Sequence, residues 1–295
     1  MAIKQAWTVL KNAFNDFIDD DAMVLAAALA YYGALSLAPL LVVLVAVAGL
    51  IGQDVSATIV QRAQEQMGPQ AAQIVGTLLQ HAQENRSAGI ISMVIGLATA
   101  IFAATAAFAH LQYSLNRIWD VQTKPGKSVS AWIRRRVISL MMVGAIGILL
   151  LVSIFATAIL SMLVPEGGAW TYLLNLGLSF AIYVVLMAVL LRLVPDVVIP
   201  WRCAWVGGAI TAVLFTLGKY AIGEYLARGT ATSAYGAAGS LLAMLLWLYY
   251  SAVILFFGAE ITQAYTWVSG AGAEPEEVAQ WEPGSLGDRL AHPAS

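Results

Sequence analysis

The stretch that decides the fold class is residues 22–53, AMVLAAALAYYGALSLAPLLVVLVAVAGLIGQ, which contains no charged side chain. A helix that crosses the hydrocarbon core of a bilayer needs about 20 mostly apolar residues. The stretch exceeds this length, and it also exceeds the apolar core of a cleaved signal peptide, which is about 7–15 residues. It follows the acidic run Asp19–Asp21 rather than a purely basic segment. We therefore predict an uncleaved transmembrane helix at 23–50.

The composition of the whole chain indicates the same class. Of its 295 residues, 60% are hydrophobic and only 11% are charged, whereas soluble domains carry about 25% charged residues. The apolar runs also lack the alternation of membrane β-barrel strands. A net charge of -2 argues against a basic nucleic-acid-binding surface, and the single cysteine, Cys203, allows no internal disulfide. These properties predict an all-α integral membrane protein.

Six transmembrane helices are predicted within a membrane domain at 23–264. Their expected positions are 23–50, 88–109, 137–164, 169–191, 203–222 and 237–259. Eleven of the 15 Lys and Arg residues then fall on the side that holds both termini. Positive charge accumulates on the cytoplasmic side of membrane proteins. We therefore expect a multi-pass protein of the bacterial inner membrane with both termini in the cytoplasm.

Three segments outside the spans have their own patterns. Residues 1–22 carry apolar side chains at every third or fourth position, which predicts an amphipathic helix on the inner membrane surface or packed under the bundle. Residues 53–86 predict an amphipathic helical hairpin on the outer side, broken at Gly68-Pro69. Residues 265–295 are rich in Gly, Pro and Glu, which predicts a disordered acidic cytoplasmic tail.

The first span contains a polar group at mid-depth, formed by Tyr31, Tyr32 and Ser36. Pro39 follows and removes one helix hydrogen bond, so we expect a kink. Broken helices of this kind line the substrate cavities of transporters. The alternative interpretation is a kinked packing helix with buried tyrosines.

Charged groups near membrane depth are costly unless they are paired or hydrated. Lys219 and Glu224 lie near the outer end of the fifth span. Glu260 ends the sixth span, where Arg117, Arg192 or Arg202 would pair with it. Structural ion pairs are the alternative to a functional role. The candidate cavity or substrate path comprises Tyr31, Tyr32, Ser36, Pro39, Asn116, Arg117, Lys219, Glu224, Tyr235, Gly236, Gly239, Tyr250 and Glu260.

Two further groups complete this candidate path. Asn116 and Arg117 fall on the predicted inner loop 110–136, which would bind anionic lipid head groups; a nucleic-acid site and a topology signal alone are the alternatives. The glycine-rich stretch 235–240 opens the sixth span and is a candidate hinge or substrate contact, or simply a packing turn.

Catalytic motifs are absent from the sequence. The three histidines, His81, His110 and His292, are far apart and show no metal-ligand spacing. Serine-hydrolase, zinc-protease and phosphate-loop motifs do not occur. We therefore expect no enzymatic activity, no metal and no cofactor.

Several stretches together resemble one known family, the YihY/virulence factor BrkB proteins, formerly labelled ribonuclease BN. The matching stretches are 27–32 with 35–39, 115–119, 235–240, 246–251 and 257–260. The resemblance implies a six-span inner-membrane protein, connected in relatives with serum resistance and envelope lipid phenotypes. The ribonuclease label would require metal-binding carboxylates or an acid–base pair. The inner loop offers a single acid, Asp120.

Three functional hypotheses follow. The favoured one is a transporter or flippase-like protein for a lipid or amphipathic solute in cell-envelope homeostasis. The alternative is a non-transporting scaffold that binds an envelope protein through residues 53–86. A ribonuclease or intramembrane enzyme is the least favoured. Membrane lipids are the expected partners, nucleic acid is not expected, and a homo-oligomer is left open.

Overall fold

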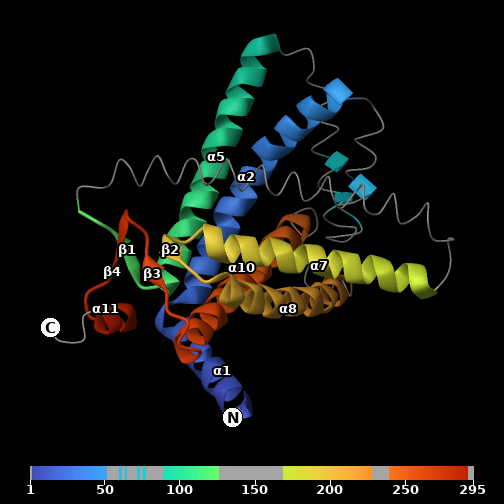
Figure 1. The fold of residues 1–295 in the computed structure, drawn as a ribbon. Coiled ribbons are helices and arrows are strands. Elements are labelled where there is room, and N and C mark those ends of the chain that lie inside the picture. The colour runs from blue at the N-terminus through green and yellow to red at the C-terminus, as the bar shows by residue number, and fades with distance from the viewer. Residues whose placement is uncertain are drawn as a thin grey trace. The chain divides into compact units, whose positions relative to one another are not determined.

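The computed structural model describes residues 2–51, 89–125, 169–227 and 239–291, together with seven positions between 60 and 77. Most of these residues are helical (Figure 1). The helices are α1 (Ala2–Asp19), α2 (Ala22–Ile51), α5 (Gly89–Ile118), α7 (Ala169–Leu193), α8 (Trp201–Ala227), α10 (Gly239–Val268) and α11 (Leu286–Ala291). The strands are β1 (Val121–Thr123), β2 (Val197–Val198), β3 (Glu274–Pro275) and β4 (Ala279–Trp281).

Helices occupy five of the six predicted spans, with α2, α5, α7, α8 and α10 at the expected positions. The predicted span 137–164 and nearly all of the predicted hairpin 53–86 lie outside the described residues. Within the described part, two segments are long and apolar enough to cross a membrane, Trp201–Glu224 and Leu241–Val268. The mainly helical, apolar fold is consistent with an all-α membrane protein, and the number of six spans stays a prediction.

The chain divides into two compact units. The first unit comprises Met1–Met23, Leu111–Thr216 and Ile254–Ser295. The second unit comprises Val24–His110 and Leu217–Val253. Helices α2, α5, α8 and α10 contribute residues to both units.

In the first unit, α1 packs against the C-terminal half of α10. Val9 and Ala13 form a buried cluster with Ile261 and Ala264. A second apolar stripe on α1 remains exposed. It consists of Trp7, Leu10, Phe14 and Ile18. The predicted helix is therefore present, and its exposed stripe is typical of a helix at a membrane surface. Its place on the inner membrane surface stays a prediction.

Helices α8 and α10 approach closely in the first unit through two matched Gly-x-x-x-Thr pairs. Gly207 of α8 contacts Thr262 of α10, and Gly258 of α10 contacts Thr211 of α8. Each threonine hydroxyl donates a hydrogen bond to the glycine carbonyl of its own helix, at 2.7 Å from Thr211 to Gly207 and 2.6 Å from Thr262 to Gly258. Small residues at four-residue spacing permit this close approach of membrane helices.

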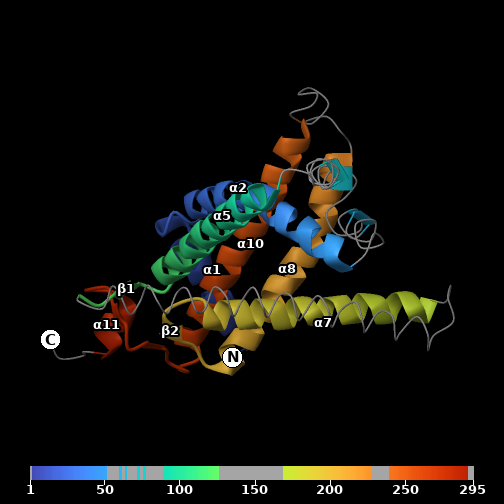
Figure 2. The same ribbon diagram turned by 90° about the horizontal axis from the view of Figure 1, so that it is seen from above.

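The C-terminal residues form an ordered part of the first unit. Strand β4 pairs antiparallel with β1, and β3 pairs antiparallel with β2 (Figures 1 and 2). Trp281 of β4 lies against Trp267, with ring centroids 5.7 Å apart, and contacts Gly287 of α11. The prediction of a disordered tail from residue 265 is therefore wrong through residue 291. Backbone pairing and a buried tryptophan outweigh the polar composition of this segment.

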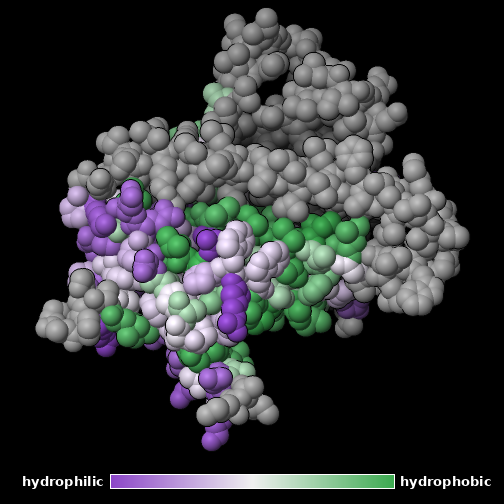
Figure 3. All heavy atoms as spheres, in the orientation of Figure 1, coloured by the Kyte–Doolittle hydropathy of each residue, from purple (hydrophilic) through white to green (hydrophobic). Residues whose placement is uncertain are grey.

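The surface of the first unit is divided by polarity. Figure 3 shows apolar residues gathered over α7 and α8, and polar residues over the C-terminal strands and α11. Large apolar side chains are exposed on both helices, among them Trp205 and Val213 of α8 and Leu193 of α7. Exposed apolar surface of this extent is typical of helices that face lipid.

The second unit contains α2, most of α5, and the remaining parts of α8 and α10. The Tyr32 ring of α2 lies against the His110 ring of α5, with centroids 5.3 Å apart. The His110 Nε2 atom is 3.0 Å from the Leu25 carbonyl oxygen. Helices α8 and α10 also meet in this unit, where Gly218 of α8 lies directly against the Tyr250 ring of α10.

Candidate functional site

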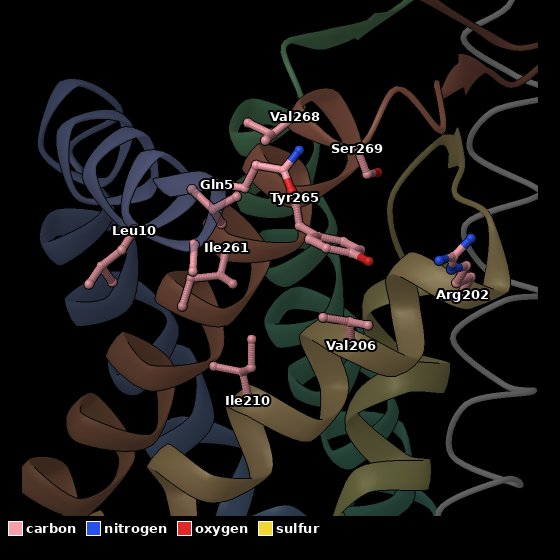
Figure 4. Close-up of a pocket in the computed structure, with 11 residues that line it drawn as sticks. Gln5, Leu10, Arg202, Val206, Ile210, Ile261, Tyr265, Val268 and Ser269 are labelled. Carbon is pink, nitrogen blue, oxygen red and sulfur yellow. The ribbon is translucent and has the colours of Figure 1, made fainter. Parts of the chain in front are cut away.

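An amphipathic groove lies in the first unit between α1, α8 and α10 (Figure 4). Its volume is about 610 Å³, which is within the range of small-molecule sites. The apolar lining comes from all three helices: Val9 and Leu10 of α1, Val206 of α8, and Ile261 and Val268 of α10. The amphipathic pattern of α1 predicted one side of this groove, and the rest depends on tertiary packing.

Polar groups are present at one part of the groove. Arg202 in the first turn of α8 is exposed, and Gln5, Tyr265 and Ser269 also line the space. Figure 4 shows the Tyr265 side chain extending from α10 toward α8, where Arg202 and Val206 lie. Among the described residues, Arg202 makes no ion pair. The groove thus combines an apolar lining with a cationic group that is available to an anion.

A buried polar network joins the C-terminal end of α5 to the turn after α7. The Asp196 carboxylate accepts hydrogen bonds from Gln112 Nε2 at 3.0 Å and from Asn116 Nδ2 at 2.7 Å. The Asp196 backbone N–H donates to Asn116 Oδ1 at 2.7 Å, and Asp196 is only 2% exposed. Asn116 is therefore a structural residue within α5. Its predicted place on an inner loop is wrong, because α5 continues to Ile118.

Glu260 is the most unusual charged residue of the first unit. It is 0% exposed, and neither carboxylate oxygen has a hydrogen-bond partner among the described residues. The predicted pairing with an arginine is wrong within this part of the chain. Arg117 instead lies beside Asp20, with 3.9 Å between Nε and Oδ1. Because Arg117 is 43% exposed, this ion pair contributes at most about 1 kcal/mol.

An acidic cluster surrounds this position. We define it as Asp16, Asp20, Asp120, Glu260 and Glu282, whose charges act on one another. Burial, followed by the charge of Asp120, raises the pKa of Asp20 to about 7. Burial, followed by the charge of Glu282, raises the pKa of Asp120 to about 6. The sequence placed these acids in four separate segments, so their proximity was missed.

The predicted residues of the first span lie in the second unit. Tyr31 is exposed, and its ring lies 5.9 Å from that of Tyr32. The Ser36 hydroxyl donates to the Gly33 carbonyl at 2.8 Å, so it stabilises its own helix. Pro39 lies within α2. The expected kink at Pro39 stays a prediction.

The remaining predicted residues are distributed along α8 and α10. Lys219 is half-buried and Glu224 is exposed, both on α8. Gly239 is buried at the start of α10, and Tyr250 is half-buried against Gly218. Two predicted residues lie outside the described residues, namely Tyr235 and Gly236.

A metal centre is not formed within the described segments, since they contain no group of three or more His, Cys, Asp or Glu residues placed to hold a metal ion. The residues that the structure brings together in the first unit are Asn116 with Asp196, and Glu260 with the aspartates of α1. The groove and the acidic cluster lie on different sides of the same segment of α10, because Ile261 and Tyr265 line the groove while Glu260 is fully buried.

Comparison with known proteins places the chain in a family of bacterial membrane proteins. The family model described as virulence factor BrkB matches residues 13–281. A "UPF0761 membrane protein" of Verminephrobacter eiseniae is 30% identical over 214 residues, which are 72% of this chain and 50% of the relative. A second, from Alcanivorax borkumensis, is 29% identical over 271 residues, which are 89% of this chain and 61% of the relative.

The chain spans about half the length of these relatives, and the same holds for a "UPF0761 membrane protein" of Delftia acidovorans, which is 30% identical over 69% of this chain and 48% of its own length. No solved structure matches the chain significantly. The family match covers most of the residues and includes the Asp196 network, the α8 and α10 sides of the groove, and every member of the acidic cluster except Glu282. The groove residues of α1 precede the matched region. The chain is therefore a membrane protein of the virulence factor BrkB family.

Proposed function

We propose that this protein binds an anionic amphiphile in the groove between α1, α8 and α10 and moves it across the membrane, as a transporter or flippase-like protein. The observation that carries the proposal is the composition of the groove. Apolar side chains from three helices line it, and the exposed guanidinium of Arg202 lies at its polar part. The occupant would be a lipid with an acidic head group.

The physical basis is the match between the groove and such a lipid. Burial of an acyl chain contributes about 25 cal/mol per Å² of apolar surface removed from water. A guanidinium binds a phosphate or carboxylate through two parallel hydrogen bonds. The exposed stripe of α1, formed by Trp7, Leu10, Phe14 and Ile18, would hold this helix at the membrane interface. A lipid would then enter the groove from the same leaflet.

The orientation that we propose places α1 and the groove on the cytoplasmic side of the inner membrane, following the charge bias of the loops. The role in cell-envelope homeostasis belongs to the same proposal. Binding of an envelope protein through residues 53–86 stays a prediction, since that segment lies outside the described residues.

The test is lipid movement in liposomes that contain the purified full-length chain. Fluorescent phospholipids with an anionic or a zwitterionic head group would be compared for the wild type and for Arg202→Gln. We expect Arg202→Gln to slow movement of the anionic lipid about tenfold, as for a loss of about 1.4 kcal/mol, with less effect on the zwitterionic lipid. Arg289→Gln on exposed α11 is the matched control.

A second variant tests the groove itself. Ile210 of α8 also lines the groove. Ile210→Trp would fill the space between α8 and α1 and reduce movement of both lipids, because it removes volume rather than charge. Absence of lipid movement in the wild type, across both head groups, would refute the transport proposal. Equal rates for the wild type and Ile210→Trp would refute the groove as the path.

A further inference from the structure

We propose that Glu260 is a proton-binding site, and that the other members of the acidic cluster connect its carboxyl group to water. This inference concerns a different site from the groove and does not depend on lipid transport. Two independent observations carry it, namely the complete burial of an unpartnered carboxyl group and the acids that lie around it.

The position of Glu260 on α10 follows from its neighbours. Phe257 lies against Phe17 of α1, with ring centroids 5.6 Å apart. Gln263 donates a hydrogen bond to the Ile118 carbonyl at the end of α5, at 2.6 Å. Residue 260 lies between these two directions on a helix with 3.6 residues per turn. Its side chain therefore points toward the junction of α1, α5 and α10.

The charges that face this junction are almost all negative. Asp20 and Asp16 come from the end of α1, and Asp120 comes from the turn after α5. Glu282 follows β4 and acts on Asp20 and Asp120. Arg117 at the end of α5 is the cation that acts on this cluster, and it lies beside Asp20 rather than Glu260.

A buried ionised carboxylate without a partner is strongly unfavourable, and nearby acids increase the cost. Three kinds of group would neutralise this buried negative charge, namely an arginine or lysine, a metal ion, or a proton. No cation is hydrogen-bonded to Glu260 among the described residues, and these residues form no group placed to hold a metal ion. A bound proton requires no further ligand, so it is the occupant that this environment fits.

The cluster also supplies a graded route to solvent. Glu260 is 0% exposed, the Asp20 side chain is 20% exposed, and Glu282 is exposed. The pKa of Asp20 is raised by burial to about 7 and that of Asp120 to about 6. Carboxyl groups with pKa values near neutrality exchange protons readily in both directions. These two aspartates are therefore suited to pass a proton between water and the buried site.

The experiment is infrared spectroscopy of the full-length protein in lipid nanodiscs at about pH 9, where Asp20 and Asp120, with pKa values of about 7 and 6, are ionised and do not contribute to the band. A protonated carboxyl group gives a C=O stretching band separate from that of carboxylates. We expect this band in the wild type, its loss in Glu260→Gln, and its retention in Glu274→Gln, which changes an exposed acid of β3. Glu260→Asp should shift the band without removing it, which keeps the test valid if the glutamine variant fails to fold. A wild-type spectrum without a Glu260 band would overturn the proposal.

The connection to water has its own measurement. Transfer into D₂O shifts the band as the proton is replaced by a deuteron. We expect exchange to slow at least severalfold in Asp20→Asn and in Asp120→Asn, and to be unchanged in Glu274→Gln. Wild-type exchange rates in both aspartate variants would overturn the proposed route. Because none of these readouts uses lipid movement, failure of the transport proposal leaves this test intact.

Discussion

Substitution of Gly207 by alanine tests the packing that brings α8 against α10. A Cβ atom at this position would lie 2.9 Å from the Thr262 Cβ and 3.1 Å from its Cγ2, and even closer to its hydroxyl. Ordinary contacts between carbon atoms are about 3.5–4.0 Å. The two helices would therefore have to separate by about 0.5–1 Å, which removes a quarter to a half of the local contact energy.

The expected magnitude follows from two opposing effects. Overpacking of a well-packed interface costs about 1–3 kcal/mol. Replacement of a helical glycine by alanine recovers about 0.5–1 kcal/mol through the unfolded state. We therefore expect a net loss of about 1–2 kcal/mol. Gly258→Ala should give a similar loss, because its added Cβ would lie 2.9 Å from Thr211 Cβ and Cγ2.

The assay is thermal unfolding of the purified protein in one detergent, followed by intrinsic tryptophan fluorescence. Gly223→Ala on the same helix is the matched control, because an added Cβ meets nothing within 4 Å there. The double variant Gly207→Ala/Thr262→Ala should lose less stability than the sum of its single variants, since residues in contact are coupled. A Gly207→Ala protein as stable as Gly223→Ala would refute the close approach.

Three other predictions concern the first unit. Asn116→Ala removes two hydrogen bonds of the buried Asp196, one to its carboxylate and one from its backbone N–H, while the bond from Gln112 remains. Stability measured by thermal unfolding should therefore fall by about 1–3 kcal/mol, and a change under about 0.5 kcal/mol would contradict this. The folded pKa of Asp20, raised to about 7 from 3.8, means that the folded state binds more protons between these values. The free energy of unfolding therefore falls as pH rises through this window, by less than about 1.4 kcal/mol per pH unit because Asp20 is partly exposed. Asp20→Asn should flatten the pH dependence of the free energy of unfolding. An unchanged slope in this variant would count against the raised pKa. Trp281→Ala removes the packing of β4 on Trp267, so limited proteolysis should cleave the chain beyond residue 268 at least severalfold faster, whereas wild-type resistance would show that β4 is held by other contacts.

The helices were largely predictable because apolar runs of this length are compatible with few structures other than a helix. The end of α5 was not, since hydropathy falls at His110 while the helix continues to Ile118. The residues in between are polar but buried, among them Gln112, Ser114 and Asn116. The hydrogen bonds of Gln112 and Asn116 to the distant Asp196, which a linear pattern does not contain, make this helical end favourable.

Among the described residues that line the groove there is none of the predicted candidate path. Asn116 and Glu260 were among the predicted candidate residues, but the side chains that surround them were not predicted. Asp196 lies 80 residues from Asn116 in sequence, and the acids around Glu260 come from α1, from the turn after α5 and from the C-terminal segment. The prediction of a disordered C-terminal segment was wrong for the same reason. Its short strands β3 and β4 pair with β2 and β1 and are stabilised only in the folded unit.

Mass spectrometry of the lipids that copurify with the intact protein would show whether the groove between α1, α8 and α10 holds an anionic lipid, as we propose. Arg202→Gln would be compared with Arg289→Gln. We expect a bound anionic lipid in the wild type and in Arg289→Gln, and about tenfold less of it in Arg202→Gln. The same lipid content in all three proteins, or a wild type without anionic lipid, would contradict the proposal.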